Sequence, residues 1–323
     1  MNTDWAYVGQ TFLLLCRNLF QLVCVFHAMS QNKPTACGRP APLIERVATL
    51  SMRLGQRYLA AYGAVRSRHD FTQRQLMSCL VLRAYLKTTY RGVVDVLAAS
   101  ASLRQCLGLG DKLPHYTTLQ KFSARSQVVA IAQKLVAAIG KAAEPKAQSD
   151  SAAMDSTGLS TSTASQYFRS RKGTQQRQWV KISVVVWCTS LLPLALVVDQ
   201  GPSNDRVQVP DLLGQAQALV QPARLYADAG YDAEWIHQQC REQWRVESVI
   251  KPSGQRADGT RNGRWRAKMS PAHLKKRGYG RRWSAESFFS GLKRTMGEAL
   301  SSRRSTTQLA EAAVKVLAYA LRR

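Results

Sequence analysis

The sequence predicts an α/β fold, in which a mixed sheet flanked by helices follows an all-α region. Two observations support this prediction. Apolar residues recur with a helical period from Leu43 to Ser126, and the period becomes strand-like after Pro145. Strand and helix patterns then alternate along the chain, which favours a sheet covered by helices.

Residues 1–42 are predicted to form an apolar helix and a linker. The run from Phe12 to Met29 is rich in Leu, Val and Phe, and residues 31–42 hold three prolines and a glycine, which is typical of a linker. The run also contains four polar residues: Arg17, Asn18, Gln21 and His27. They favour a core or interface helix. A membrane span or an uncleaved signal is the alternative, in which these side chains would be costly.

Residues 43–148 are predicted to form a helical, DNA-binding domain. Helices are expected over 43–62, 72–87, 90–107, a short segment opened by Pro114, and 127–148. Thr117 and Gln120 are expected to form a capping box for the short helix. Short helices with tight connections and a basic last member are typical of helix-turn-helix domains. A plain structural bundle is the alternative, because helix propensity does not show which helix faces DNA.

Residues 149–304 are predicted to carry the sheet, and residues 305–323 a closing helix. Strands are expected over 152–157, 179–188, 193–199, 225–228 and 246–250, with an extra strand or turn at 166–169. Helices are expected over 209–220, with Asp205 or Pro210 near its start, and over 232–244. Trp235 and His237 in the second helix are expected to pack in the core. The Gly, Arg and Lys-rich stretch between Ile250 and Tyr279 is expected to be a basic loop.

The charge of the chain points to a polyanionic partner. Lys and Arg outnumber Asp and Glu by 46 to 20, giving a net charge of +26. Between Lys251 and Arg304 there are fifteen Lys and Arg against three acids. Nucleic acid is the natural partner, because each neutralised phosphate releases counterions. The seven cysteines show neither a disulfide framework nor zinc-site spacing.

Two acidic residues lie where strands are expected to end. Asp155 follows the apolar Ala-Ala-Met and precedes Ser-Thr-Gly, and Asp228 follows Leu-Tyr-Ala and precedes Ala-Gly-Tyr-Asp. Either acid alone commonly caps a turn. Together with a third acid, Glu286, they can converge at one edge of the sheet. Such a cluster raises carboxyl pKa values unless a hard divalent cation compensates, and Mg²⁺ prefers oxygen ligands.

The third acid is predicted to lie on an amphipathic helix. Arg282, Glu286 and Lys293 fall within a narrow arc at 100° per residue. The adjacent stripe is apolar and consists of Ala285, Phe288, Phe289, Leu292 and Met296. The helix can therefore dock on the core and still present Glu286. A solvated ladder of salt bridges is the alternative.

These residues together resemble the bacterial insertion-sequence transposases, which have a DDE catalytic domain of RNase H-like fold. Met-Asp155-Ser-Thr-Gly resembles their first motif and Asp228-Ala-Gly-Tyr-Asp their second. Tyr279, Arg282, Glu286 and Lys293 resemble their Y-(2)-R-(3)-E-(6)-K signature. The resemblance covers residues 150–300 most clearly.

The resemblance implies Mg²⁺-dependent cleavage at the element's ends and transfer of the freed 3′-hydroxyl into target DNA. It implies that Asp155, Asp228 and Glu286 hold two Mg²⁺ ions, with Mn²⁺ able to substitute. Tyr279, Arg282 and Lys293 would hold phosphates of the strand being cut. The expected partner is double-stranded DNA, both the terminal inverted repeats and the target. A homodimer is expected in the synaptic complex, in the nucleoid of the cytoplasm, with no membrane partner. A non-catalytic sequence-specific DNA-binding protein and an RNase H-like nuclease are the alternatives.

Overall fold

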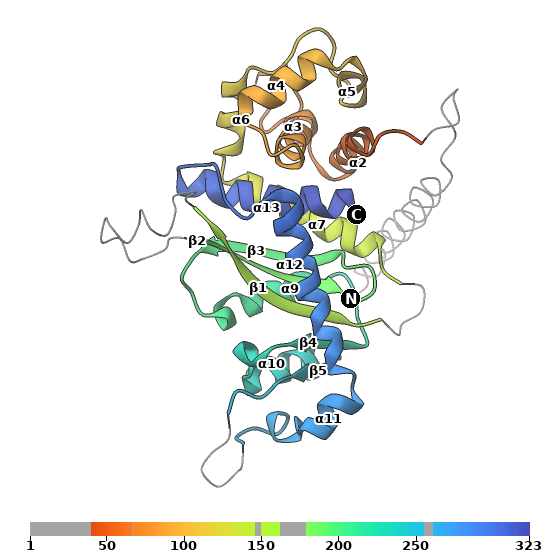
Figure 1. Ribbon diagram of the computed structural model, residues 1–323, viewed down its shortest axis with the longest axis vertical. Helices are drawn as coiled ribbons and strands as arrows, with labels where there is room; N and C mark the ends of the chain where they lie inside the picture. Colours follow the sequence, from red (N-terminus) through yellow and green to blue (C-terminus); the bar gives the residue numbers. More distant parts are fainter. Residues whose placement is uncertain (1–39, 67, 146–149, 162–178, 255–260) are drawn as a thin grey trace, which may run out of the picture. The chain divides into compact units, whose positions relative to one another are not determined.

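The computed structural model describes residues 40–66, 68–145, 150–161, 179–254 and 261–323 (Figure 1). The predicted helix over 12–29, most of the linker and the extra strand or turn at 166–169 lie outside these ranges. Within the described ranges, no helix combines the length and apolar character that a membrane crossing requires.

Five strands form one mixed sheet, which confirms the predicted fold class. They are β1 (Ala152–Ser160), β2 (Trp179–Trp187), β3 (Pro193–Gln200), β4 (Arg224–Ala227) and β5 (Glu247–Ile250). The strand order is β3-β2-β1-β4-β5. The pairings β1 with β2 and β2 with β3 are antiparallel, whereas β4 runs parallel to both β1 and β5. The parallel pairing places the end of β4 beside Met154 in β1, which continues to Ser160, so Asp155 lies within its strand and not at the strand end expected from the sequence.

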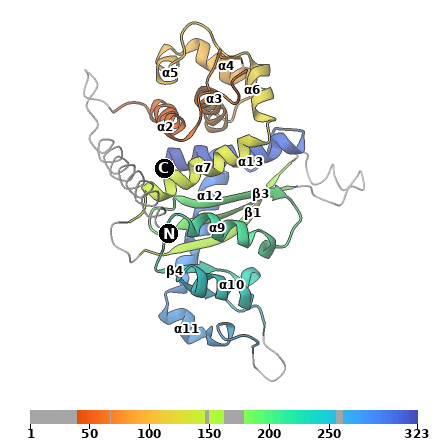
Figure 2. The ribbon, with the colours of Figure 1, turned by 180° about the vertical axis from the view of Figure 1, so that it is seen from behind.

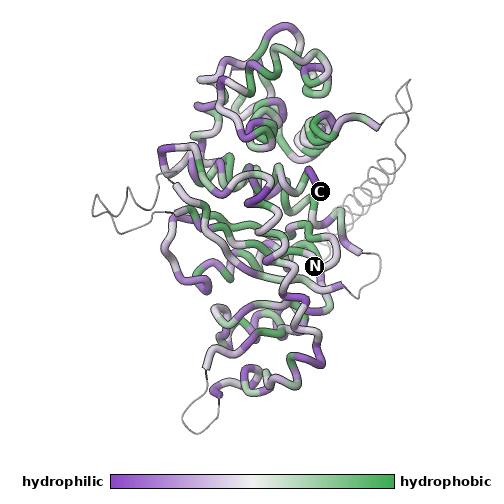
Figure 3. Tube along the Cα trace, viewed as in Figure 1, coloured by the Kyte–Doolittle hydropathy of each residue, from purple (hydrophilic) through white to green (hydrophobic). Residues whose placement is uncertain are grey.

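Helices cover both faces of the sheet (Figures 1 and 2). One face carries α7 (Gln127–Ala142), α12 (Trp283–Met296) and α13 (Ser305–Arg322), and the other carries α9 (Val209–Gln217) and α10 (Glu234–Gln238). Alternation along β2 supplies both cores: Val180, Ile182 and Val184 pack on the first face, and Val185 and Trp187 on the second. In Figure 3 hydrophobic residues follow the strands, while hydrophilic stretches gather around α11 (Pro271–Lys276).

The N-terminal helices share the first of these cores. They are α2 (Leu43–Tyr58), α3 (Gln73–Tyr85), α4 (Tyr90–Ala99), α5 (Ala101–Cys106) and α6 (Tyr116–Ser123). α13 contacts α2, α3 and α6. Arg83 of α3 and Glu311 of α13 form a buried ion pair at 3.5 Å. Ser301 and Ser302 donate further hydrogen bonds to Glu311, so the buried charge is well compensated.

Two predictions for the helical region were wrong. The helix expected over 90–107 is broken at Ser100, whose hydroxyl accepts a hydrogen bond from the Leu103 amide and so begins a second helix. The expected capping box at Thr117 does not form. Instead, the ring of His115 accepts the Thr117 amide, at 3.4 Å, and caps α6. A capping box does form at α3, between Thr72 and Gln75.

The second half differs from prediction at two further helices. The helix expected over 232–244 is α-helical only over α10 and continues as a π-helical turn, Gln239–Gln243. The basic stretch after Ile250 is not loop throughout, because α11 begins after Ser270, whose hydroxyl accepts the His273 amide. Six residues are too few for helical periodicity to show in the sequence.

Candidate active site

Asp155 and Asp228 are brought to neighbouring positions by the parallel pairing of β1 and β4. Met154 pairs with Ala227, and each aspartate is the next residue along its strand. The Asp155 Oδ1 atom accepts the Ser156 amide at 2.8 Å, and the Asp228 Oδ1 atom accepts the Gly230 amide at 2.9 Å. Each carboxylate is therefore fixed through one oxygen by its own backbone.

Glu286 reaches the same edge from α12. The predicted apolar stripe is buried, which docks the helix across β1 and β2 and leaves Glu286 exposed. Two hydrogen bonds fix the start of the helix: the Ser284 hydroxyl donates to the Cys188 carbonyl at 3.1 Å, and the Tyr226 hydroxyl donates to the Arg277 carbonyl at 2.8 Å. The entry to α12 is thus attached to both β2 and β4.

The electrostatics of Asp155 show that the three acids interact. The pKa of Asp155 is raised to about 6, chiefly by burial and also by the charges of Asp228 and Glu286, while the Ser156 amide and Arg282 oppose the shift. A carboxyl group whose pKa is raised by the charges of two other acids lies within electrostatic range of both. The three carboxylates singled out in the sequence therefore lie within electrostatic range of one another.

The carboxylate of Glu286 is engaged by a cation in this arrangement. The Arg282 Nη2 atom donates to Glu286 Oε1 at 2.5 Å. Within the described ranges, no three His, Cys, Asp or Glu side chains are arranged to hold a metal ion as they stand. The donor chemistry nevertheless fits a hard divalent cation, because all three groups are carboxylates. Release of Glu286 from Arg282 would complete the donor set.

Tyr279 and Lys293 occupy different surroundings. Tyr279 lies in the 3-10 turn Tyr279–Arg282, and burial raises its pKa to about 12, with Asp228, Asp155 and Glu286 acting in the same direction. Its buried hydroxyl has no hydrogen-bond partner among the described residues. Lys293 lies two turns beyond Glu286 on α12. Tyr279 thus belongs to the cluster of acids, whereas Lys293 extends the same helix face.

Four polar residues lie behind Asp155 and Asp228 and were not predicted as part of the site: Ser156, Lys181, Asp205 and Tyr231. Asp205 accepts hydrogen bonds from Lys181 and from the Ser156 hydroxyl, each at 2.6 Å. The hydroxyl of Tyr231 is buried, and the charges of Asp205, Asp155 and Asp228 help burial to raise its pKa well above the ordinary value. Lys181 could have indicated these residues, because it is a single charged residue in an apolar strand and a buried lysine requires an acidic partner.

The expectation that Trp235 and His237 pack in the core was half right. His237 is fully buried, and its Nδ1 atom lies 2.8 Å from the Ser248 hydroxyl. Trp235 is 41% exposed. The short length of α10 explains the difference, because a single turn buries only one of its sides.

The sequence also matches a known family. Residues 147–321, more than half of the chain, match the family described as the transposase DDE domain. A search of curated proteins finds no significant match. Members of this family catalyse phosphoryl transfer, bind DNA and generally use divalent metals. Because this match spans more than half of its residues, the chain belongs to the transposases with a DDE domain.

Proposed function

We propose that this transposase cuts DNA at the ends of an insertion sequence and joins the freed 3′-hydroxyl to target DNA. Asp155, Asp228 and Glu286 are the catalytic carboxylates of this proposal. The observation that carries it is the match of residues 147–321 to the transposase DDE domain, together with the parallel pairing of β1 and β4 that sets Asp155 beside Asp228. Carboxylates that lie near one another in a partly buried site destabilise one another unless a cation compensates their charge.

The three carboxylates would hold two Mg²⁺ ions, with Mn²⁺ able to substitute. When bound, such ions activate a water or hydroxyl nucleophile and stabilise charge on the phosphoryl oxygens. Asp155 must lose a proton, which it holds with a pKa of about 6 in the free protein, before it can ligate a cation. Glu286 must likewise release the guanidinium of Arg282 before it can ligate a cation.

Arg282, Tyr279 and Lys293 would hold phosphates of the strand being cut. Once it releases Glu286, the Arg282 guanidinium presents two donors to a phosphate, which it can bind bidentately. The unpartnered hydroxyl of Tyr279 can donate to a phosphate oxygen beside the same acids. These roles support the finer assignment to insertion-sequence transposases with the Y-(2)-R-(3)-E-(6)-K signature.

The helical region over 43–148 would bind the terminal inverted repeats, ahead of a catalytic domain over 149–304 and a closing helix over 305–323. Two element ends must be held together for joining, so we expect a homodimer in the synaptic complex. The nucleoid of the cytoplasm is the expected site of action, because both DNA substrates are there.

The test is incubation of the purified protein with element-end DNA and Mg²⁺. The proposal expects nicks that leave a 3′-hydroxyl, followed by joined products when target DNA is added. Nicking without joining would instead identify a nuclease. A metal-independent footprint without cleavage under any divalent ion would identify a DNA-binding protein that lacks this chemistry.

A further inference from the structure

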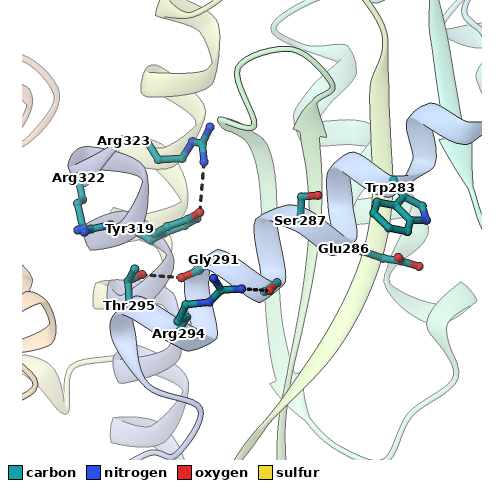
Figure 4. A pocket seen from close by; sticks show the side chains of 10 residues that line it. Trp283, Glu286, Ser287, Gly291, Arg294, Thr295, Tyr319, Arg322 and Arg323 are labelled. Atoms are coloured by element: carbon teal, nitrogen blue, oxygen red, sulfur yellow. Dashed lines mark hydrogen bonds between the residues drawn. The ribbon is translucent and has the colours of Figure 1, made fainter.

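A groove of about 570 Å³ runs between α12 and the end of α13 (Figure 4). Glu286 and Trp283 lie at one end of it, and Arg322 and Arg323 lie at the other. Six residues of α12 line the groove at helical spacing, so they form one continuous stripe of the helix. They are residues 283, 286, 287, 290, 291 and 294. The groove therefore begins at the proposed catalytic carboxylate and leads away from it.

The groove is cationic beyond Glu286. Arg294 and Arg322 are exposed and line it, and Glu286 is its only acidic lining residue among those described. Arg294 donates to the neutral Ser290 hydroxyl at 3.1 Å. No described ion pair involves Arg294 or Arg322. Two guanidinium charges are thus available to an anion from outside the chain.

The floor of the groove allows a close approach. Between Glu286 and Arg294 the stripe presents only Ser287, Ser290 and Gly291. A Cβ atom at Gly291 would lie 2.0 Å from the Tyr319 hydroxyl oxygen, so this glycine lets α13 close the groove from the side. Eight residues of helix span about 12 Å. That distance equals the axial rise of roughly three to four base pairs of a duplex.

We propose that the α12–α13 groove binds the backbone of the DNA strand that continues from the reacting phosphate at Glu286. This inference rests on the proposed function, because it takes Glu286 as the point where the strand reacts. A phosphodiester chain fits the groove better than a compact anion. The lining residues extend along α12 from Glu286 to Arg294 rather than surrounding one point, and the hydroxyls of Ser287 and Ser290 offer donors to phosphate oxygens. Arg294 and Arg322 are assigned as phosphate contacts.

The experiment measures binding of a 30-base-pair duplex of arbitrary sequence by fluorescence anisotropy, in EDTA and over a series of salt concentrations. Loss of one phosphate contact makes the negative slope of the log binding constant against log salt concentration less steep by about 0.9. Arg294→Gln and Arg322→Gln should each show this change. Lys134→Gln, which removes an exposed charge from α7 outside the groove, should leave the slope near the wild-type value. Ser287→Glu, which adds a negative charge to the floor, should weaken binding.

Two results would overturn the inference. The first is a slope that stays unchanged in both arginine variants. The second is a slope that falls as much in Lys134→Gln as in the arginine variants, which would indicate only the general electrostatic attraction of a basic protein for DNA. Because EDTA removes divalent ions, these outcomes do not depend on catalysis. A wild-type protein that binds through the groove but never cleaves with Mg²⁺ would contradict the proposed function and leave the groove assignment standing.

Discussion

The ammonium nitrogen of Lys181 lies 2.6 Å from a carboxylate oxygen of Asp205, behind the sheet edge that carries Asp155 and Asp228. The lysine side chain is only 5% exposed, and it also donates to the Ser203 carbonyl at 2.8 Å. The same Asp205 oxygen accepts the hydroxyl of Ser156, the residue after Asp155. This pair therefore supports the middle of β1 from the face opposite α12.

The turn after Asp228 contacts the same pair. A Cβ atom at Gly230 would lie 3.1 Å from the Asp228 carboxylate and 3.2 Å from that of Asp205. Arg206, next to Asp205, donates to the Gly230 carbonyl at 2.9 Å. Asp205 and its neighbour thus hold both proposed aspartate ligands in position.

Lys181→Met is expected to impair metal use more than folding. Methionine fills a similar volume, but Asp205 loses its cation and no longer holds Ser156 firmly. Loss of such a supporting contact typically costs 10- to 100-fold in metal affinity or activity. Cleavage measured against Mg²⁺ concentration should show a half-saturation point raised by about tenfold or more. A wild-type Mg²⁺ curve for Lys181→Met would refute the supporting role.

Gly291→Ala is expected to destabilise the protein, although alanine normally favours a helix interior by up to about 1 kcal/mol. The added Cβ would meet the Tyr319 hydroxyl at 2.0 Å. Overpacking of this kind costs typically 1–3 kcal/mol. Urea denaturation should show this loss in the free energy of unfolding. In a Tyr319→Phe background, which lacks the hydroxyl, the same substitution should cost less; an equal cost in both backgrounds would exclude this contact as the cause.

The folded protein is expected to lose stability between pH 7 and pH 5 through His237. Burial, together with the charge of Arg241, lowers the pKa of His237 to about 4, whereas an unfolded histidine has a pKa of about 6.5. The stabilisation is therefore fully present above pH 6.5 and is lost as the pH falls towards 4. At pH 5 the loss amounts to about 2 kcal/mol.

Urea denaturation of wild type and His237→Asn at the two pH values measures this effect. The variant should have a lower free energy of unfolding at pH 7 but a smaller difference between pH 7 and pH 5. An identical pH dependence in both proteins would show that other groups cause the loss.

The sequence located the five described strands to within a few residues, because their apolar runs are bounded by clear turn residues. It also singled out Asp155, Asp228 and Glu286 as the candidate catalytic carboxylates, since each lies in a motif with distinctive neighbours. The break at Ser100 was missed because both flanking segments share one apolar period. The Lys181–Asp205 pair joins residues 24 positions apart, and no local pattern predicts which acid a buried lysine will meet. Such partners are set by the antiparallel return of β3 and the turn that follows it.

Joint binding of divalent ions by Asp155, Asp228 and Glu286 is tested most directly by titrating Mn²⁺ into the protein bound to element-end DNA, with free Mn²⁺ followed by electron paramagnetic resonance. The wild type and Lys134→Gln should take up two ions per chain. Asp155→Asn, Asp228→Asn and Glu286→Gln should each lose tight uptake while still binding DNA. Undiminished uptake of both ions by all three variants would contradict a metal site built from these carboxylates.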